Sequence, residues 1–211
     1  MELPWSERRA APRGLLVVVV VTAVISALCI LAVDQPVALA LAPYEPSSLW
    51  DRGIDLVEWV IVFPVWRYAL PVALVVGMLA CVIVKRWRGA APAWMFVAGV
   101  HLASRLTVNW FKDGTARLRP WQWVKKGATG ETFGWEGGVS FPSGHVVLFG
   151  SVIIPLVVLF PKLRPLLAVL AFVALARIAV EAHFVSDTIA AVTLIAAWTW
   201  LVGLAARPLK S

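Results

Sequence analysis

Six ionisable residues lie at the ends of long apolar segments in the C-terminal half of the chain: Lys112, Arg119, His145, Arg177, His183 and Asp187. An ionisable group at such a place is costly and therefore points to function. Three cations facing one point favour a multiply charged anion, and phosphate is the natural ligand. A histidine held by a carboxylate is an oriented nucleophile or base, and a second histidine can act as an acid. These residue types therefore predict phosphoryl transfer through a phosphohistidine.

The segment Pro142-Ser143-Gly144-His145 adds a further binding place for an anion. The backbone N–H groups of Ser143 and Gly144 lead into a predicted helix, and the N-terminus of a helix attracts negative charge. The sequence shows no set of carboxylates or cysteines suited to zinc or magnesium. We therefore expect a reaction with no metal and no cofactor.

Three motifs of the chain resemble the three-part signature of the type-2 phosphatidic acid phosphatase family, in the order that the family has them. They are Lys112-x6-Arg119-Pro120, Pro142-Ser143-Gly144-His145 and Arg177-x5-His183-x3-Asp187. The resemblance covers roughly residues 90–206 and implies a membrane-bound phosphatase with six helices.

The resemblance also implies a role for each residue of the motifs. His183 would attack phosphorus, Asp187 would orient His183, and His145 would protonate the leaving oxygen. Five residues would hold the phosphate oxygens: Lys112, Arg119, Ser143, Gly144 and Arg177. The substrate would be a lipid phosphate monoester or pyrophosphate, of the undecaprenyl pyrophosphate, phosphatidylglycerol phosphate, phosphatidic acid or lipid A type.

Other interpretations of the same residues remain open. Lys112 and Arg119 are typical of cations that reach from a helix end to the membrane surface. Arg177 and Glu181 are four residues apart and can form an ion pair on one helix, and Asp187 can cap a helix. The two histidines can ligate a haem between helices. A lipid phosphotransferase would use the same phosphohistidine, and a non-enzymatic lipid carrier would use the cations alone.

The elements that position these residues are predicted by composition. Of 211 residues, 61% are hydrophobic and 15% are charged, and the mean hydropathy is +0.84. Soluble domains carry about 25% charged residues, and disordered chains are poor in apolar residues. Both classes are excluded, so the sequence predicts an integral membrane protein with one domain.

Six apolar runs predict an all-α bundle of six transmembrane helices, because backbone groups in lipid must be satisfied within the segment. The predicted spans are residues 15–33, 68–84, 90–111, 146–160, 166–183 and 188–206. The first run has 19 residues, which is longer than the 7–15 apolar residues of a secretory signal. We therefore expect it to be retained as a helix.

The distribution of Lys and Arg predicts the orientation. With the N- and C-termini in the cytoplasm, ten of the 19 Lys and Arg fall in inner segments and seven in outer ones. The six ionisable residues then lie at the outer face, which would be the periplasmic face of a bacterial inner membrane. The net charge of +7 is explained by this topology, so we expect a lipid substrate and no nucleic acid. No feature predicts an oligomeric state.

Two of the predicted outer segments have sequence patterns that predict structure. Residues 48–62 have an apolar stripe and predict an amphipathic helix, either lying in the membrane interface or packed as a connector. Residues 113–141 are glycine-rich and predict a lid loop. Its tryptophans, Trp121, Trp123 and Trp135, would anchor the loop at the membrane interface or line the mouth of the site. Lys125 and Lys126 would then contact a second phosphate of the substrate. The cysteines, Cys29 and Cys81, are predicted to be buried and unbridged.

Two further ionisable residues lie inside the third predicted span. His101, Arg105 and Lys112 share one helical face. We predict that Arg105 pairs with Glu181 beneath the site, with a water-filled cavity around Arg105 as the alternative. His101 is predicted to be a buried histidine with its hydrogen bonds satisfied.

Overall fold

A computed structural model describes residues 10–44, 48–60, 68–135 and 137–205, and this part of the chain is all-α and contains no strand. The helices are α1 (Ala10–Ala32), α2 (Asp34–Leu41), α3 (Ser48–Val60), α4 (Ala69–Ile83), α5 (Ala91–Thr115), α6 (Pro120–Lys125), α7 (Gly144–Leu159), α8 (Leu166–Ala179) and α9 (Val185–Ala205), with 3-10 turns η1 (Lys85–Ala90) and η2 (Pro161–Leu163). The predicted all-α class is therefore confirmed.

Prolines and short polar residues set the helix boundaries. Pro92 lies in the first turn of α5 and Pro120 begins α6, where a missing N–H costs nothing. Ser143 is the N-cap of α7, and Pro165 precedes α8. Within α8 all residues but Phe172 and Arg177 are Val, Leu, Ile or Ala, so helix formation there satisfies the backbone without polar side chains.

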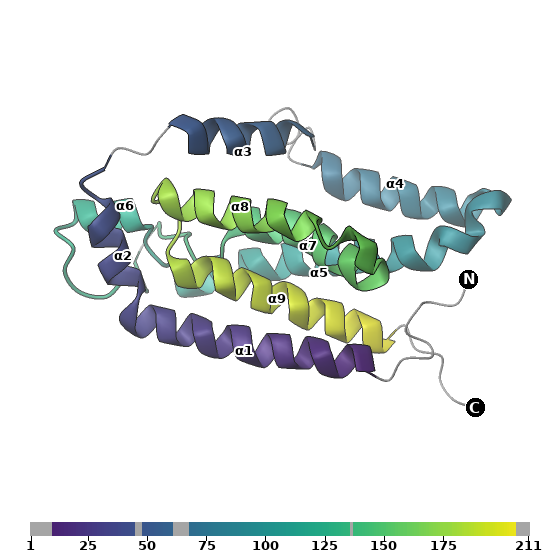
Figure 1. Ribbon diagram of the computed structural model, residues 1–211, viewed down its shortest axis with the longest axis horizontal. Helices are drawn as coiled ribbons and strands as arrows, with labels where there is room; N and C mark the ends of the chain where they lie inside the picture. Colours follow the sequence, from purple (N-terminus) through teal and green to yellow (C-terminus); the bar gives the residue numbers. More distant parts are fainter. Residues whose placement is uncertain (1–9, 45–47, 61–67, 136, 206–211) are drawn as a thin grey trace.

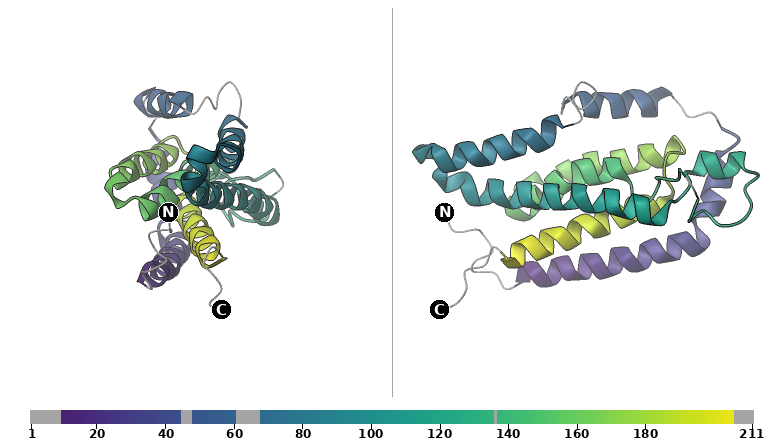
Figure 2. Two further views of the ribbon diagram at one scale, coloured as in Figure 1. Left: turned by 90° about the vertical axis from the view of Figure 1, so that its right-hand side faces the viewer. Right: turned by 180° about the vertical axis from the view of Figure 1, so that it is seen from behind.

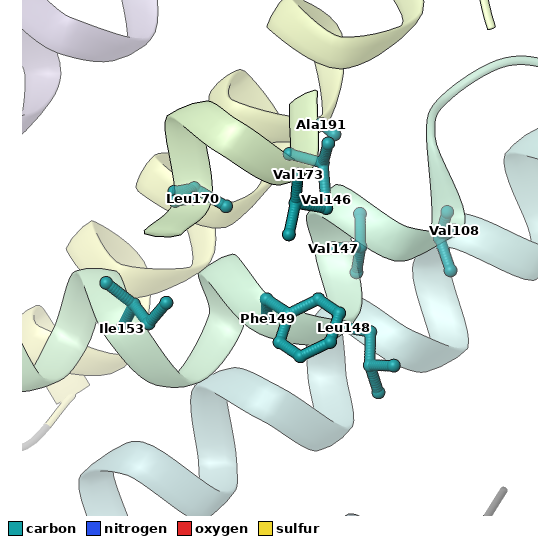
Figure 3. Close-up of a cluster of buried hydrophobic side chains, with 9 residues drawn as sticks. All are labelled: Val108, Val146, Val147, Leu148, Phe149, Ile153, Leu170, Val173 and Ala191. Carbon is teal, nitrogen blue, oxygen red and sulfur yellow. The ribbon is translucent and has the colours of Figure 1, made fainter. Parts of the chain in front are cut away.

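The long helices α1, α5, α7, α8 and α9 lie side by side along the longest axis of the molecule (Figure 1). α7 packs against α5, α8 and α9, and α1 packs against α9; Figure 2 shows the same bundle along its axis and from behind. The side chains at the centre come from four helices: Val108, Val146, Val147, Leu148, Phe149, Ile153, Leu170, Val173 and Ala191 (Figure 3). This packing fixes the beginning of α7, which carries the Ser143-Gly144-His145 motif.

Different elements lie at the two ends of the bundle. α2, α6, the segments 116–135 and 137–143, and the link between α8 and α9 lie at one end (Figure 1). The other end has the beginning of α1, the turns η1 and η2, and the end of α9. The chemistry-bearing motifs are therefore gathered at the end away from both ends of the described chain.

The surface of the bundle is apolar. α1 alone exposes nine large aliphatic side chains: Leu16, Val17, Val18, Val20, Val21, Val24, Ile25, Leu28 and Leu31. Among the described helices, Arg13–Ala32 and Val185–Ala205 are long and apolar enough to cross a membrane. α4 and the segment 85–125 pass the same test only as a pair, bent by 119°. An apolar exposed surface of this kind indicates a membrane protein.

Six spans remain a prediction, as does the side on which the termini lie. α7 has 16 residues and α8 has 14. At 1.5 Å per residue they extend about 24 and 21 Å, which is less than the roughly 30 Å of a hydrocarbon core. The predicted span at 166–183 is shorter in the structure because α8 ends at Ala179, which places His183 in the link to α9.

Helix α3 falls in the predicted range 48–62, of which residues 61 and 62 lie outside the described part. It lies along α8 rather than across the end of the bundle (Figure 1). Ile54 is buried, and Trp50 stacks on Phe172 of α8 with ring centroids 5.8 Å apart. A Cβ at Gly53 would collide with the Phe172 ring, so glycine allows this close approach. The contacts are those of a packed helix, and its depth relative to a membrane surface stays a prediction.

Candidate active site

The structure brings the three motifs together at one end of the bundle. Lys112 is in the last turn of α5, and Arg119 precedes α6. His145 is in the first turn of α7, and Arg177 is in the last turn of α8. His183 lies in the α8–α9 link, and the first turn of α9 follows with Asp187.

His183 and Asp187 form a buried pair. His183 Nδ1 is 3.5 Å from Asp187 Oδ2, and the two side chains are 2% and 0% exposed. The Ser140 hydroxyl donates to Asp187 Oδ2 at 2.6 Å, and the Phe184 N–H donates to the same oxygen at 2.8 Å. Burial lowers the pKa of His183 to about 4, from an ordinary value of 6.5. The imidazole is therefore neutral at pH 7, the form that a nucleophile needs.

Arg117 holds the other oxygen of Asp187, and sequence reasoning did not select it. Its Nη1 donates to Asp187 Oδ1 at 2.5 Å, and its Nη2 donates to Asp34 Oδ2 at 2.7 Å. The guanidinium is 1% exposed and lies over the ring of Phe184, 4.2 Å from the centroid. Arg117 therefore neutralises two buried carboxylates and fixes the one beside His183.

Asp34, at the beginning of α2, is the second residue that sequence reasoning missed. Its carboxylate accepts from the Ser186 N–H at 3.0 Å and from the Ser186 hydroxyl at 2.5 Å. α2 is thereby tied to the first turn of α9, next to Asp187. The available signal was an acidic residue directly after a long apolar run, but 83 residues separate Asp34 from Arg117, so spacing could not pair them.

Glycine allows the segment after α6 to reach this network. A Cβ at Gly138 would collide with the backbone of residues 116 and 117. Without that Cβ, the segment lies against Arg117, and the Ser140 N–H donates to the Arg117 carbonyl at 2.9 Å. This contact places the Ser140 hydroxyl within hydrogen-bond distance of Asp187.

The three predicted phosphate-binding cations lie near one another. Among the charged neighbours of Lys112 and of Arg177, Arg119 repels both most strongly. Lys112 Nζ donates to the Val139 carbonyl at 2.7 Å and would be 3.5 Å from a Cβ at Gly144. The cations of motifs one and three and the helix N-terminus of motif two thus meet at one place.

Two donors at this place have no acceptor among the described residues. They are the buried Arg177 Nε and the buried Ser143 hydroxyl. The Ser143 N–H is used, since it donates to the Asp187 carbonyl at 3.0 Å. Buried donors without partners are costly, and an anion with several oxygens would satisfy both.

His145, the third predicted catalytic residue, contacts a residue from α3. Its Nε2 is 2.6 Å from Glu58 Oε1, with exposures of 25% for His145 and 13% for Glu58. Glu58 falls in the amphipathic helix predicted at residues 48–62, and sequence reasoning gave it no role. The signal was weak because 87 residues separate the two.

The predicted Arg105–Glu181 pair is not among the ion pairs of the described residues, so that prediction is wrong. Arg105 Nη1 donates to the Gly144 carbonyl at 3.4 Å, and Glu181 Oε1 has no hydrogen-bond partner among the residues that the structure describes. The reason is that α8 ends at Ala179, so Glu181 leaves the helical face it was assumed to share with Arg177. The same break leaves the alternative Arg177–Glu181 pair unformed within the described part.

His101 is fully buried, as predicted, but its hydrogen bonds are half made. Nδ1 is 2.8 Å from the Ser151 hydroxyl, while Nε2 has no partner among the described residues.

The predicted lid loop is partly helical. α5 continues to Thr115, and α6 follows within the loop. Trp123 is buried at 2% exposure against Phe184 and donates from Nε1 to the Gly130 carbonyl, so it does not line a mouth. Trp121 and Trp135 are exposed, and Lys126 Nζ lies 3.9 Å from the Trp135 ring centroid. Cys29 and Cys81 are buried and free, as predicted.

The site thus combines a neutral histidine oriented by a carboxylate, a second histidine, and a group of cations. The arrangement suits transfer of a phosphoryl group to His183.

Comparison with known families gives one match. A model of the PAP2 superfamily matches residues 93–208, which is more than half of the chain. A search of curated proteins and a search of solved structures returned no match. The matched range contains all three motifs, and Asp34 and Glu58 lie before it. The chain belongs to the PAP2 superfamily, whose members are generally phosphatases.

Proposed function

We propose that the protein is a metal-independent lipid phosphatase. It hydrolyses a lipid phosphate monoester or pyrophosphate through a phosphohistidine on His183. The observation that carries the proposal is the buried pair of His183 and Asp187, in which the carboxylate is held by Arg117 and Ser140. A histidine fixed in this way has a neutral ring and a defined orientation, which a purely electrostatic anion site would not need.

The first step forms the phosphoenzyme. Because Nδ1 faces Asp187, the nucleophile is Nε2 of His183. The N–P bond forms while the P–O bond to the leaving group breaks. The electron pair of that bond goes to the leaving oxygen, which takes a proton from His145. Asp187 stabilises the positive charge that develops on the His183 ring.

The second step returns the enzyme to its starting state. Water attacks phosphorus, and His145, now neutral, takes its proton. The P–N bond breaks, and its electron pair returns to His183 Nε2. In both steps Lys112, Arg119 and Arg177 stabilise the charge on the non-bridging oxygens. The Ser143 hydroxyl and the N-terminus of α7 at Gly144 supply further donors.

The surroundings of the site support a lipid as the substrate. The site lies at one end of an apolar bundle, where a headgroup phosphate would reach the cations while its acyl or prenyl chain stays beside the helices. Undecaprenyl pyrophosphate, phosphatidylglycerol phosphate, phosphatidic acid and lipid A phosphates all fit this description. By the charge distribution of the sequence, this end faces the periplasm.

The test is release of inorganic phosphate by detergent-purified protein from a panel of these lipids, with EDTA present. We expect release that persists in EDTA and is abolished in His183→Ala. Rapid quenching with labelled substrate should trap an acid-labile, alkali-stable phosphoprotein in wild type and none in His183→Ala. Release that EDTA abolishes would overturn the mechanism. Turnover only with an added acceptor lipid would identify a phosphotransferase instead.

A further inference from the structure

Glu58 is the one carboxylate that the described structure places in contact with the ring of His145. It comes from α3, which precedes the matched range of the family model. The 2.6 Å separation of Oε1 and Nε2 is that of a strong hydrogen bond. Both side chains are mostly buried, so solvent screens the contact only in part.

Among the described residues, cations also act on His145. Lys112 acts on it from α5 and Arg177 from α8, and Arg105 donates to the carbonyl of the adjacent Gly144. Burial of His145 disfavours a protonated imidazole most, and its positive neighbours disfavour it further. A residue that must donate a proton in the first step therefore needs a compensating negative charge, and Glu58 supplies it.

We propose that Glu58 is a positioning residue that favours the protonated form of His145 and orients its ring for donation to the leaving oxygen. This inference rests on the proposed phosphatase function and deepens it. It extends the catalytic apparatus to a helix outside the family region.

The packing of α3 fits this role. Ile54 is buried and lies four residues before Glu58, so the two share one helical face. Gly53 and Trp50 contact Phe172 of α8, the helix that carries Arg177. Apolar contacts thus hold α3 on α8, and this packing fixes the position of the Glu58 carboxylate beside His145.

A rival role makes a different prediction. Glu58 also attracts Arg177, so its carboxylate would occupy the place of the substrate phosphate and leave when substrate binds. Removing such a competitor would lower KM and leave kcat unchanged. Removing a positioning residue would lower kcat and leave KM nearly unchanged.

The experiment compares Glu58→Gln with wild type and with Asp55→Asn, a matched control on the exposed side of α3. With a lipid phosphate whose leaving group is an alcohol, we expect Glu58→Gln to lower kcat about tenfold, a part of the 10²–10⁴-fold that an acid contributes. The alkaline limb of its pH–rate profile should move to lower pH. Asp55→Asn should match wild type in both.

A second substrate makes the test specific. p-Nitrophenyl phosphate has a leaving group that departs without protonation, so Glu58→Gln should retain most of its kcat on it. An equal loss on both substrates, an unshifted profile, or a lower KM with unchanged kcat would each overturn the proposal. Failure of the phosphatase function itself is distinguishable, because wild type would then release no phosphate or His183→Ala would remain active.

Discussion

At the scale of single residues, the site is a balance of buried charges. Asp187 and Asp34 share one guanidinium, and Arg117 is in turn covered by aromatic rings. A buried ion pair repays its desolvation only when every lone pair is used. Here Ser140, Ser186 and backbone N–H groups complete the bonds, so the carboxylate beside His183 stays ionised and oriented.

Replacing Arg117 should therefore damage both stability and turnover. Arg117→Met leaves two buried carboxylates without a counter-ion, and breaking such a pair costs about 3–5 kcal/mol. We expect a lower melting temperature in detergent and at least a tenfold loss of kcat. Arg52→Met, on the exposed side of α3, is the control.

The double variant Arg117→Met/Asp34→Asn separates the two effects. It removes one of the stranded charges, so part of the melting temperature should return. kcat should stay low, because Asp187 still lacks its guanidinium. Wild-type behaviour of Arg117→Met in both measurements would show that the network does not position Asp187.

Acid should destabilise the fold through His183. Its pKa is about 4 in the fold and 6.5 ordinarily, so the unfolded chain binds the proton first as the pH falls. Stability is therefore complete above about pH 6.5 and is lost between about pH 6.5 and 4. Melting temperatures over this range should fall less steeply in His183→Gln, which has no proton to gain. Parallel curves for the two proteins would contradict a buried neutral His183.

At the scale of elements, motif spacing predicted which helix ends carry the candidate site but not which other helices contact them. The ends of α5 and α8 and the beginnings of α7 and α9 follow from apolar runs bounded by prolines and polar residues. α2 and α3 add Asp34 and Glu58 through tertiary contacts more than 80 residues away in sequence. Such contacts leave no periodic signal, and an early helix end, as at Ala179, was enough to misplace Glu181.

The packing of α3 against α8 should affect turnover, because it sets the distance between Glu58 and His145. In Gly53→Val a side chain would collide with the Phe172 ring and push α3 outward. That displacement separates Glu58 from His145, so kcat on a lipid phosphate should fall to about the level of Glu58→Gln, roughly tenfold. Adding Phe172→Ala makes room for the valine and should restore most of the activity. The argument fails if Gly53→Val retains full kcat, or if Phe172→Ala alone causes the same loss.

At the scale of the whole molecule, composition predicted a helical membrane protein correctly because apolar side chains cover the outside as well as the core. Hydropathy predicted six spans, whereas two of the described helices are long and apolar enough to cross a membrane alone, and α7 and α8 are shorter than a hydrocarbon core. One end of the bundle carries the candidate active site and is called the functional end, and the opposite end has η1 and η2 (Figure 1). Because the two ends differ, the orientation of the protein in the membrane can be determined by finding which end faces the outside.

Cysteine labelling can decide which end faces outward. In a Cys29→Ser/Cys81→Ser background, Glu131→Cys reports on the functional end and Lys162→Cys on the opposite end, and both positions are exposed. The excess of Lys and Arg in the segments opposite the site predicts that the functional end is periplasmic. A membrane-impermeant maleimide should therefore label Glu131→Cys in intact cells and label Lys162→Cys only after permeabilisation. The reverse pattern would place the site in the cytoplasm and restrict its substrates to inner-leaflet lipids. Labelling of both positions in intact cells would mean that the two ends do not lie on opposite sides of the membrane.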